Sequence, residues 1–501
     1  MMLLTSVGII SRTIGILFRI YMSNRIGAEG IGLFQLISTV YLFCATLTTS
    51  GMSLAVTRLV TECIAKNSRC KIRSILKRCI LISSILSIIT GTALFSFAPY
   101  IGQFIIKDMR TILPLKILSV SIPFMAMSSC FRGYFFAVRE VIKTASEQLL
   151  EQLIEIGIFA AIAGYLIPKG IEYACCAIVI GTTVAEVVSL FYSFLLYYAD
   201  VQKFEMCCGP DKKIYRNILK ISLPITASSC LRSGLNTLEN ILITQGLIKF
   251  GSSVQASLST YGTLSGMVMP ILSFPASVLF AFSSLLIPEL SESYAAKHNK
   301  SISHVVSKVF QITLLFSFFI SGIFIFHAKE ISFCIYKSNT PGIYLGILAP
   351  LVPLMYLDSV VDGMLKGLNQ QMYNLSYNII DSIFSIVCIY LFLPIKGIYA
   401  LMVIICASTL LNAVMSISRL IKVASPNVSF LNFILSPILS ISVPCLIVKY
   451  VSNCFSVSEN YFSLGFKIIL IAISYITLLF ISGSIQKSNL VIILRKEKRG
   501  V

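Results

Sequence analysis

The chain has 501 residues, of which 56% are hydrophobic and 12% are charged, and its mean hydropathy is +0.88. Soluble domains carry about 25% charged residues, so this composition excludes an ordinary soluble globular protein. The formal net charge of +19 would suggest a nucleic-acid partner in a soluble protein. Here the cations lie between apolar runs of roughly 20 residues, each long enough to cross a hydrocarbon core of about 30 Å. We therefore expect a multi-pass membrane protein and no nucleic-acid partner.

Fourteen membrane-spanning helices are predicted, because charged, Gly/Pro and Asn/Ser clusters interrupt the apolar sequence. In chain order they cover 2–23, 30–53, 79–104, 113–135, 146–167, 171–199, 217–246, 258–286, 305–327, 343–365, 372–394, 397–420, 430–451 and 463–485. The first apolar run has no basic segment before it and no small-residue cleavage site, so a retained first span is expected rather than a signal peptide. The predicted fold class is an all-α integral membrane protein.

Lysine and arginine are distributed unevenly among the connections. With the N-terminus inside, the even-numbered connections and the tails hold 26 of them and the odd-numbered connections hold 11. The remaining three, Arg12, Arg19 and Arg232, lie within predicted spans. The positive-inside rule then predicts that both termini face the cytoplasm.

An internal repeat relates two halves of the chain at a fixed offset of 230 residues. The aligned pairs are Gly32 with Gly262, Glu62 with Glu292, Pro123 with Pro353, Gly133 with Gly363, Ser146 with Ser376, and Glu151 with Asp381. A repeat of six helices gives both copies the same orientation, related by an axis along the membrane normal.

The repeat predicts two six-helix lobes around a central cavity, followed by two extra helices. The N-terminal lobe covers 1–199, a basic cytoplasmic linker covers 200–216, and the C-terminal lobe covers 217–421. The extra helix pair and a basic tail occupy 422–501.

Three groups of motifs resemble the stage V sporulation protein B family. They are Ser11-Arg12-x-x-Gly15…Arg19 with Gly27-Ala-Glu-Gly30-x-Gly32-Leu-Phe-Gln35; Phe131-Arg-Gly-Tyr134 with Glu147-Gln…Glu151-Gln; and Tyr261-Gly-x-Leu-Ser-Gly266…Pro270…Phe274-Pro275…Pro288-Glu-Leu-Ser-Glu292. That family belongs to the multidrug/oligosaccharidyl-lipid/polysaccharide exporter superfamily and is similar to lipid II flippases. The resemblance implies a two-lobed, V-shaped transporter of fourteen helices in a bacterial cytoplasmic membrane, and it does not fix the substrate.

The arginines within spans are the candidate substrate ligands. Arg12 and Arg19 are two helical turns apart and project from one helix face, and a guanidinium grips phosphate oxygens bidentately. The alternative, a structural pair with an acid or a position at the interface, stays open. Lipid II flippases also carry basic residues in spans 2 and 8, where this chain has Ala45 and Leu264. For Arg232, an anion contact and an ion pair with Glu239 are equally supported.

Acidic and amide side chains within spans are candidates for ion coupling. Glu147, Glu151 and Glu155 form an i, i+4, i+8 stripe, which must face protein, water or headgroups because lipid would exclude it. Lobe packing and proton or cation coupling both remain open for this stripe. A second candidate joins Asn378 and Asp381 on the predicted helix 372–394 to Thr409 and Asn412 on 397–420, whose oxygens suit Na⁺.

A candidate gate follows from the repeat, which aligns Arg132 with Asp362 near the cytoplasmic ends of equivalent helices. We expect these opposite charges to help close the cytoplasmic side in the outward-open state. Two unrelated charges at helix ends are the alternative interpretation.

The leading hypothesis is a flippase that moves an undecaprenyl-pyrophosphate-linked saccharide across the membrane by alternating access. Arg12, Arg19 and Arg232 would bind its diphosphate, and Na⁺ or H⁺ or the membrane potential would drive it. No catalytic residue, metal site, other cofactor or ATPase subunit is predicted, and a monomer is expected. The alternatives are a cation-coupled multidrug antiporter of the same fold, an intramembrane lipid-modifying enzyme, disfavoured because the chain has three histidines, and a non-transporting scaffold.

Overall fold

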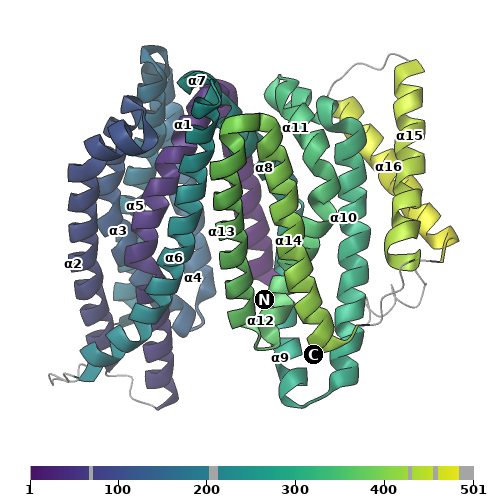
Figure 1. The fold of residues 1–501 in the computed structure, drawn as a ribbon. Coiled ribbons are helices and arrows are strands. Elements are labelled where there is room, and N and C mark those ends of the chain that lie inside the picture. The colour runs from purple at the N-terminus through teal and green to yellow at the C-terminus, as the bar shows by residue number, and fades with distance from the viewer. Residues whose placement is uncertain (1, 67–70, 202–212, 427–430, 455–460, 484–501) are drawn as a thin grey trace. The chain divides into compact units, whose positions relative to one another are not determined.

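The computed structural model describes residues 2–66, 71–201, 213–426, 431–454 and 461–483, and no β-strand occurs in these ranges. Its first half contains α1 (Met2–Ala65), α2 (Lys71–Tyr100), η1 (Ile101–Ile106), η2 (Met109–Thr111), α3 (Ile112–Ala137), α4 (Val141–Leu166), η3 (Ile167–Lys169), α5 (Ile171–Val201), α6 (Lys213–Lys249), α7 (Val254–Tyr261) and η4 (Gly262–Val268). Its second half contains α8 (Met269–Ser273), α9 (Ala276–Ala295), α10 (Asn299–Tyr336), α11 (Thr340–Leu348), η5 (Ala349–Leu351), α12 (Val352–Gly367), α13 (Gln371–Lys396), α14 (Ile398–Ala424), η6 (Leu431–Leu435), α15 (Ser436–Cys454) and α16 (Tyr461–Ile481) (Figure 1).

Eleven described helical segments are long and apolar enough to cross a membrane, which confirms the predicted all-α, multi-pass membrane class. The first of them, Ile10–Ala65, joins the predicted helices 2–23 and 30–53. The two helices meet at a kink at Gly27 (φ 71°, ψ 178°), where the backbone is not helical and adopts a conformation that glycine reaches without a Cβ clash. The segments α6 and α7–α9 are not among the eleven, so the count of fourteen stays a prediction.

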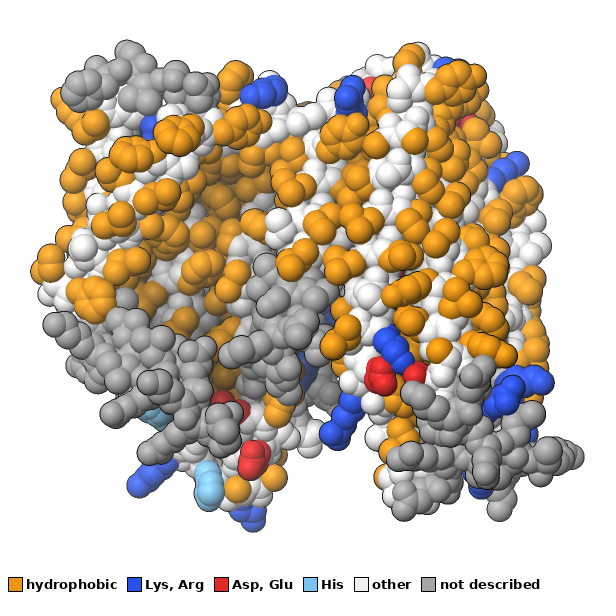
Figure 2. Space-filling view, turned by 180° about the vertical axis from the view of Figure 1, so that it is seen from behind, with side chains coloured by type: hydrophobic (Ala, Val, Ile, Leu, Met, Phe, Trp, Pro, Cys, Tyr) orange, Lys and Arg blue, Asp and Glu red, His pale blue; other side chains and the backbone are white. Residues whose placement is uncertain are grey.

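The surface agrees with a membrane position. On the face drawn in Figure 2, hydrophobic side chains form most of the middle of the surface, and charged side chains gather toward the two ends of the helices. Exposed aromatic and aliphatic side chains such as Phe97, Phe191 and Phe466 are 60% or more accessible. An apolar surface of this extent is stable in lipid and not in water.

The described helices form two compact units. One comprises Met1–Gly266 with Ile386–Ile398, and the other comprises Met267–Ser385 with Tyr399–Val501. The first unit includes α6 and α7 because both pack against α1. The division at 200–216, which follows the repeat rather than packing, stays a prediction, and most of that linker lies outside the described residues.

Backbone turns repeat at the predicted offset. Lys107 (φ 63°) and Lys337 (φ 54°) both end a helix in the left-handed region, as do Arg139 (φ 64°) and Asn369 (φ 57°). The turns at 139 and 369 also share a hydrogen bond. In each, the amide three residues after the helix donates to the carbonyl five residues before it, Glu140 to Phe135 (2.9 Å) and Gln370 to Leu365 (2.8 Å). The two halves therefore share helix ends as well as sequence.

Helix crossings repeat as well. A Cβ on Gly133 would overlap the carbonyl oxygen of Ser53, and a Cβ on the aligned Gly363 would overlap the aligned side chain, Ser283. Each unit thus contains the same close crossing of two helices at a glycine. The offset changes to 227 residues at Gly170 and Gly397, which precede α5 and α14, because the three residues of η3 have no counterpart after α13.

A further glycine pair lies at the crossing of α1 with α7 and η4. A Cβ on Gly32 would overlap the carbonyl oxygen of Leu258, and a Cβ on Gly262 would overlap that of Ala28. The two glycines are repeat partners, and so are the two residues whose carbonyls they contact. The crossing is therefore symmetric, and its two backbones approach to a distance that only glycine permits.

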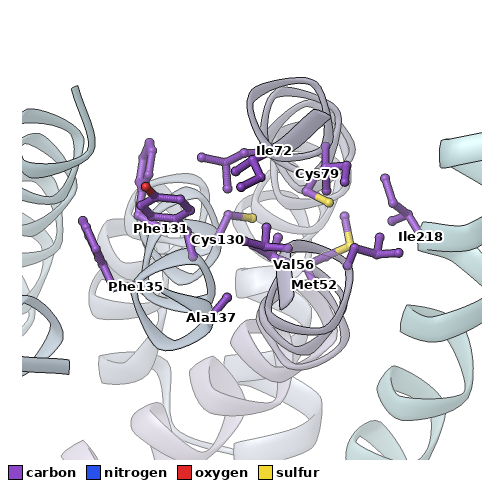
Figure 3. Close-up of a cluster of buried hydrophobic side chains, with 14 residues drawn as sticks. Met52, Val56, Ile72, Cys79, Cys130, Phe131, Phe135, Ala137 and Ile218 are labelled. Atoms are coloured by element: carbon purple, nitrogen blue, oxygen red, sulfur yellow. The ribbon is translucent and has the colours of Figure 1, made fainter. Parts of the chain in front are cut away.

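A buried hydrophobic cluster packs the C-terminal part of α1 against α2 and α3. It contains Met52 and Val56 of α1, Ile72 and Cys79 of α2, and Cys130, Phe131 and Phe135 of α3 (Figure 3). Cys130 and Phe131 are 0% and 3% exposed. Arg132 is the next residue along α3, so this packing fixes the backbone from which the Arg132 side chain extends.

In the second unit, α16 is attached to α10 by polar contacts. The ammonium of Lys467 lies 2.8 Å from Oε2 of Glu330. The other carboxylate oxygen of Glu330, Oε1, lies 3.2 Å from Nδ1 of His327. The hydroxyl of Tyr475 donates to the carbonyl of Leu315 at 2.9 Å. Paired charges of this kind are the form in which a buried lysine is tolerated.

Candidate functional site

A charged cluster with two buried carboxylates lies where α3, α4 and α5 meet. The turn at Arg139 folds α4 back along α3, so that Arg132 and Glu147 are almost equally far from the turn and face each other. Arg132 Nε lies 3.9 Å from Glu147 Oε1, and Arg132 Nη1 lies 3.8 Å from Glu151 Oε2. We call Arg132, Glu147, Glu151 and Glu186 the N-terminal junction.

Hydroxyl groups complete the N-terminal junction. Glu147 Oε1 accepts hydrogen bonds from Ser128 of α3 (2.5 Å) and Ser189 of α5 (2.9 Å), and Ser189 also lies 3.4 Å from Glu151 Oε2. Glu186 of α5 interacts electrostatically with Glu151, Arg132 and Glu147. Glu147 and Glu186 are 0% and 3% exposed, whereas the side chains of Arg132 and Glu151 are partly exposed.

The junction holds fewer partners than its charges require. Three carboxylates surround one guanidinium, and one carboxylate oxygen each of Glu147 and Glu186 has no hydrogen-bond donor among the described residues. A buried carboxylate oxygen without a donor costs about 1–3 kcal/mol or more. The arrangement can therefore bind a positive charge or a proton.

Arg12 and Arg19 both lie exposed on α1 and both interact with other groups. The neighbouring Ser11 donates to Gln152 of α4 at 3.0 Å, which places this part of α1 beside α4. Arg19 interacts electrostatically with Glu155, whose carboxylate accepts a hydrogen bond from Thr182 at 2.8 Å. Arg19 therefore lies within electrostatic range of an acid, and both of its predicted roles stay predictions.

Arg232 lies exposed on α6, and Glu239 is half-buried two turns further along. Arg232 forms no ion pair with any side chain that the structure describes, whereas Glu239 interacts with other groups. The opposite side of α6 packs on α1, because Thr237 contacts the carbonyl of Thr39 (3.3 Å) and Gly234 lies against Phe43. Arg232 therefore projects away from this helix contact, which favours the anion contact over the ion pair.

The second unit has a polar cluster at the equivalent meeting of α12, α13 and α14. Asn412 of α14 donates to Asp358 Oδ2 at 3.0 Å, and Ser408 donates to Asp381 of α13 at 2.5 Å. Asp358 also interacts electrostatically with Asp362 and Asp381. We call Asp358, Asp362, Asp381 and Asn412 the C-terminal junction.

The predicted sodium-binding residues meet only in part. Asp381 and Asn412 both belong to the C-terminal junction, and Thr409 adjoins Ser408, the hydroxyl partner of Asp381. Asn378 instead donates back to the carbonyl of Asn374, one turn earlier on α13, at 2.9 Å. No group of three His, Cys, Asp or Glu side chains is placed to hold a metal ion in the described ranges.

The predicted gate residues occupy equivalent places in separate units. Arg132 is held by Glu147 and Glu151 within its own unit, and its side chain is 18% exposed. Asp362 lies beside Asp358, one turn away on α12. Their pairing across the units stays a prediction.

Sequence reasoning missed Glu186 and Asp358. Glu186 is one acid inside an otherwise apolar run. It could have been found in the same way as Arg232, as a charge in the middle of a predicted span. Asp358 was detectable from the repeat, because the offset aligns it with Ser128, the hydroxyl that binds Glu147.

Comparison with known proteins identifies relatives over most of the chain. Stage V sporulation protein B of Bacillus subtilis (strain 168) is 28% identical over 374 residues, which cover 74% of this chain and 72% of that protein. Lipid II flippase MurJ of the same organism is 24% identical over 391 residues, which cover 73% of this chain and 71% of that protein. The predicted resemblance to the stage V sporulation protein B family is confirmed.

Solved structures share the fold. A structure of lipid II flippase MurJ in an inward closed conformation has a TM-score of 0.68 at 15% identity, over 95% of this chain and 98% of that chain. An inward-facing multidrug resistance MATE family transporter of the MOP superfamily has a TM-score of 0.63 at 13% identity, over 83% of this chain and 96% of that chain. These identities establish the fold alone.

The polysaccharide biosynthesis protein family matches residues 1–294, which is more than half of the chain and contains the whole N-terminal junction. Two of the named proteins are a flippase and a transporter, which is consistent with the prediction that this chain is not an enzyme. The chain belongs to the polysaccharide biosynthesis protein family and is a multi-pass membrane protein.

Proposed function

We propose that this chain is a flippase that moves an undecaprenyl-diphosphate-linked saccharide, a lipid II-like molecule or another envelope polysaccharide precursor, from the inner to the outer leaflet. The head group would cross within the protein while the lipid tail stays in the bilayer, and the protein would alternate between inward-open and outward-open states. The family match and the similarity to a lipid II flippase support this substrate class.

The observation that carries the proposal is the exposure of Arg12, Arg19 and Arg232 within helices of a membrane protein. A guanidinium at membrane depth costs about 3 kcal/mol on insertion scales, so an exposed one faces a polar path or a ligand rather than lipid. All three lie on α1 and α6 of the first unit. A diphosphate carries the charge and the oxygen geometry that guanidinium groups recognise.

The sequence contains no nucleotide-binding motif, so an ion gradient or the membrane potential would supply the driving force. Proposed coupling residues are Glu151, Glu239, Asn378, Asp381, Thr409 and Asn412, with Na⁺ or H⁺ as the ion. Hard oxygen ligands of this kind suit Na⁺, and carboxylates alone suit H⁺.

A gate made by Arg132 and Asp362 is part of the same proposal. Arg132→Cys and Asp362→Cys, in a background without the 15 native cysteines, should crosslink in the outward-open state and not in the inward-open state. Crosslinking at equal rates with and without substrate and membrane potential would contradict the gate.

The experiment that tests the flippase is a leaflet assay in cells depleted of this protein. Depletion should lower the amount of lipid-linked precursor in the outer leaflet, and wild type should restore it. Arg12→Ala should restore less than a tenth of the wild-type amount, because a lost charged contact to phosphate is worth about 1.5–3 kcal/mol. Arg12→Lys should restore an intermediate amount, since lysine keeps the charge without the bidentate geometry.

The matched control is Arg58→Ala. Arg58 is also an exposed arginine of α1, but it pairs with Glu62 at 3.2 Å near the inner end of the helix, so this variant should restore the full amount. Unchanged outer-leaflet precursor on depletion would overturn the flippase. Export of cationic drugs in place of precursor would support the antiporter of the same fold.

A further inference from the structure

The N-terminal junction contains charge that substrate binding does not use. Fully ionised, Glu147, Glu151 and Glu186 carry three negative charges against the single positive charge of Arg132. Charges buried at membrane depth must be matched nearly one for one, because desolvation costs several kcal/mol per ion. The junction therefore needs at least one further positive charge.

Among the described residues, the charged and titratable groups on the neighbouring helices do not supply this positive charge. From α1 the junction faces the hydroxyl of Tyr41, which interacts electrostatically with Glu186, Glu151 and Arg132. Arg19, also on α1, interacts with Glu155, one turn beyond Glu151. From α3 and α5 the remaining neighbours are the hydroxyls of Ser128 and Ser189, which are neutral.

The geometry also shows where a further positive charge would bind. Glu147 is 0% exposed and its Oε1 already accepts from two hydroxyls, whereas its Oε2 has no donor among the described residues. Glu186, 3% exposed, likewise has one oxygen without a donor in the described part of the chain. These two buried oxygens are free to take a hydrogen.

A proton suits this place better than a metal ion. The guanidinium of Arg132 lies within 4 Å of both Glu147 and Glu151, so it repels a second cation there. A metal ion needs several oxygens arranged around it, and no described group of three acidic, His or Cys side chains provides that arrangement. A proton binds one oxygen and needs no coordination shell.

We propose that the N-terminal junction is a proton-binding site, in which Glu147, Glu151 and Glu186 share a proton beside the fixed charge of Arg132. The inference that this proton drives transport rests on the proposed function. When the proton binds, the carboxylates lose a negative charge and attract Arg132 less strongly. When the proton leaves, the full attraction returns. The junction thereby links the protonation state of the first unit to the position of a charge at the end of α3.

Infrared difference spectroscopy of the purified full-length protein in lipid nanodiscs tests the site. Wild type should show the carbonyl-stretch band of a protonated carboxylic acid, which disappears as the pH is raised and is unchanged when Na⁺ replaces K⁺. Glu147→Gln, Glu151→Gln or Glu186→Gln should reduce or shift this band. Arg132→Gln should keep the band present to higher pH, because the fixed charge that opposes protonation is gone.

Two further variants test the assignment of the band to the junction even if the glutamine variants do not fold. Ser189→Ala removes a hydroxyl that donates to Glu147 and Glu151 and should move the band to higher frequency without changing any charge. Glu62→Gln alters an exposed glutamate of α1 that pairs with Arg58 and should leave the band unchanged. A band that does not titrate, that Na⁺ abolishes, or that none of the junction variants moves would overturn the proton site.

The failure of this inference and the failure of the flippase are distinguishable. The spectra are recorded without lipid-linked saccharide. The absence of a titrating band would therefore overturn the proton site and would not affect the conclusion from the leaflet assay. A titrating band in a protein that does not change the leaflet distribution would overturn the flippase and leave the proton site.

Discussion

The two repeats build the same three-helix junction with opposite charge at one position. The repeat aligns Arg132 with Asp362, and Glu151 with Asp381. In the first unit the guanidinium lies about equally close to two carboxylates. In the second unit a carboxylate occupies the aligned position, and an amide and a hydroxyl bind the aspartates instead.

This difference shows which features the two repeats share and which differ between them. Helix ends and glycine crossings are alike in the two halves, because they depend on backbone geometry. The charges at the junctions differ although the backbone around them is alike. One scaffold can therefore bind a proton beside a fixed cation in one half and carry a different polar cluster in the other.

The largest expected effect comes from removing the fixed cation. Arg132→Gln leaves the buried Glu147 and the half-buried Glu151 without their cation, so the free energy of unfolding should fall by roughly 3–5 kcal/mol. Thermal unfolding in detergent at pH 7 measures this. Arg58→Gln breaks an exposed pair with Glu62 and should cost only about 0.5 kcal/mol. An Arg132→Gln variant as stable as Arg58→Gln would mean that the guanidinium does not hold the junction together.

The glycine crossings should show a smaller effect that is unequal between the halves. A Cβ at Gly133 meets the backbone carbonyl of Ser53, which cannot move alone, whereas a Cβ at Gly363 meets the hydroxyl of Ser283, which can rotate away. Gly133→Ala should therefore destabilise by about 1–3 kcal/mol, and Gly363→Ala by less.

The control for this pair is Gly157→Ala in α4, where a Cβ would meet nothing within 4 Å. That variant should gain about 0.8 kcal/mol from helix propensity alone. The same detergent unfolding assay compares the three variants. Equal losses at Gly133 and Gly363 would show that Ser283 is as immobile as the backbone of Ser53.

The smallest effect is expected at the C-terminal junction. Asp358→Asn keeps an oxygen that can accept from Asn412 and removes a negative charge next to Asp362. Stability at pH 7 should change by no more than about 0.5–1 kcal/mol, because the loss of a charged acceptor is offset by reduced repulsion. A loss as large as that of Arg132→Gln would show that the second unit depends on its charge as strongly as the first.

The sequence predicted the all-helical membrane class, the repeated helix ends and the family, because each can be read from hydropathy, a fixed offset or local motifs. Hydropathy locates spans, and a fixed offset locates equivalent glycines. The break between the predicted helices 2–23 and 30–53 corresponds to the kink at Gly27, where the backbone is not helical.

The candidate site could be predicted only as a set of separate charges. Helical spacing placed Glu147 and Glu151 on one face, but it did not show that Arg132 of the preceding helix lies against them. Nor did it connect Glu186, because partners on different helices depend on how the helices pack. The turn at Arg139 carried the missing signal, since an antiparallel helix pair brings residues equally far from its turn together.

The most direct test of the central claim is translocation by the purified protein in liposomes that contain an undecaprenyl-diphosphate-linked saccharide. A membrane-impermeant reagent reports how much of the saccharide reaches the outer leaflet. Wild type and Arg58→Ala should move it at the same rate, whereas a variant with Arg12→Ala, Arg19→Ala and Arg232→Ala should move it no faster than protein-free liposomes. Equal rates in wild type and the triple variant, or no movement above protein-free liposomes in wild type, would contradict the account.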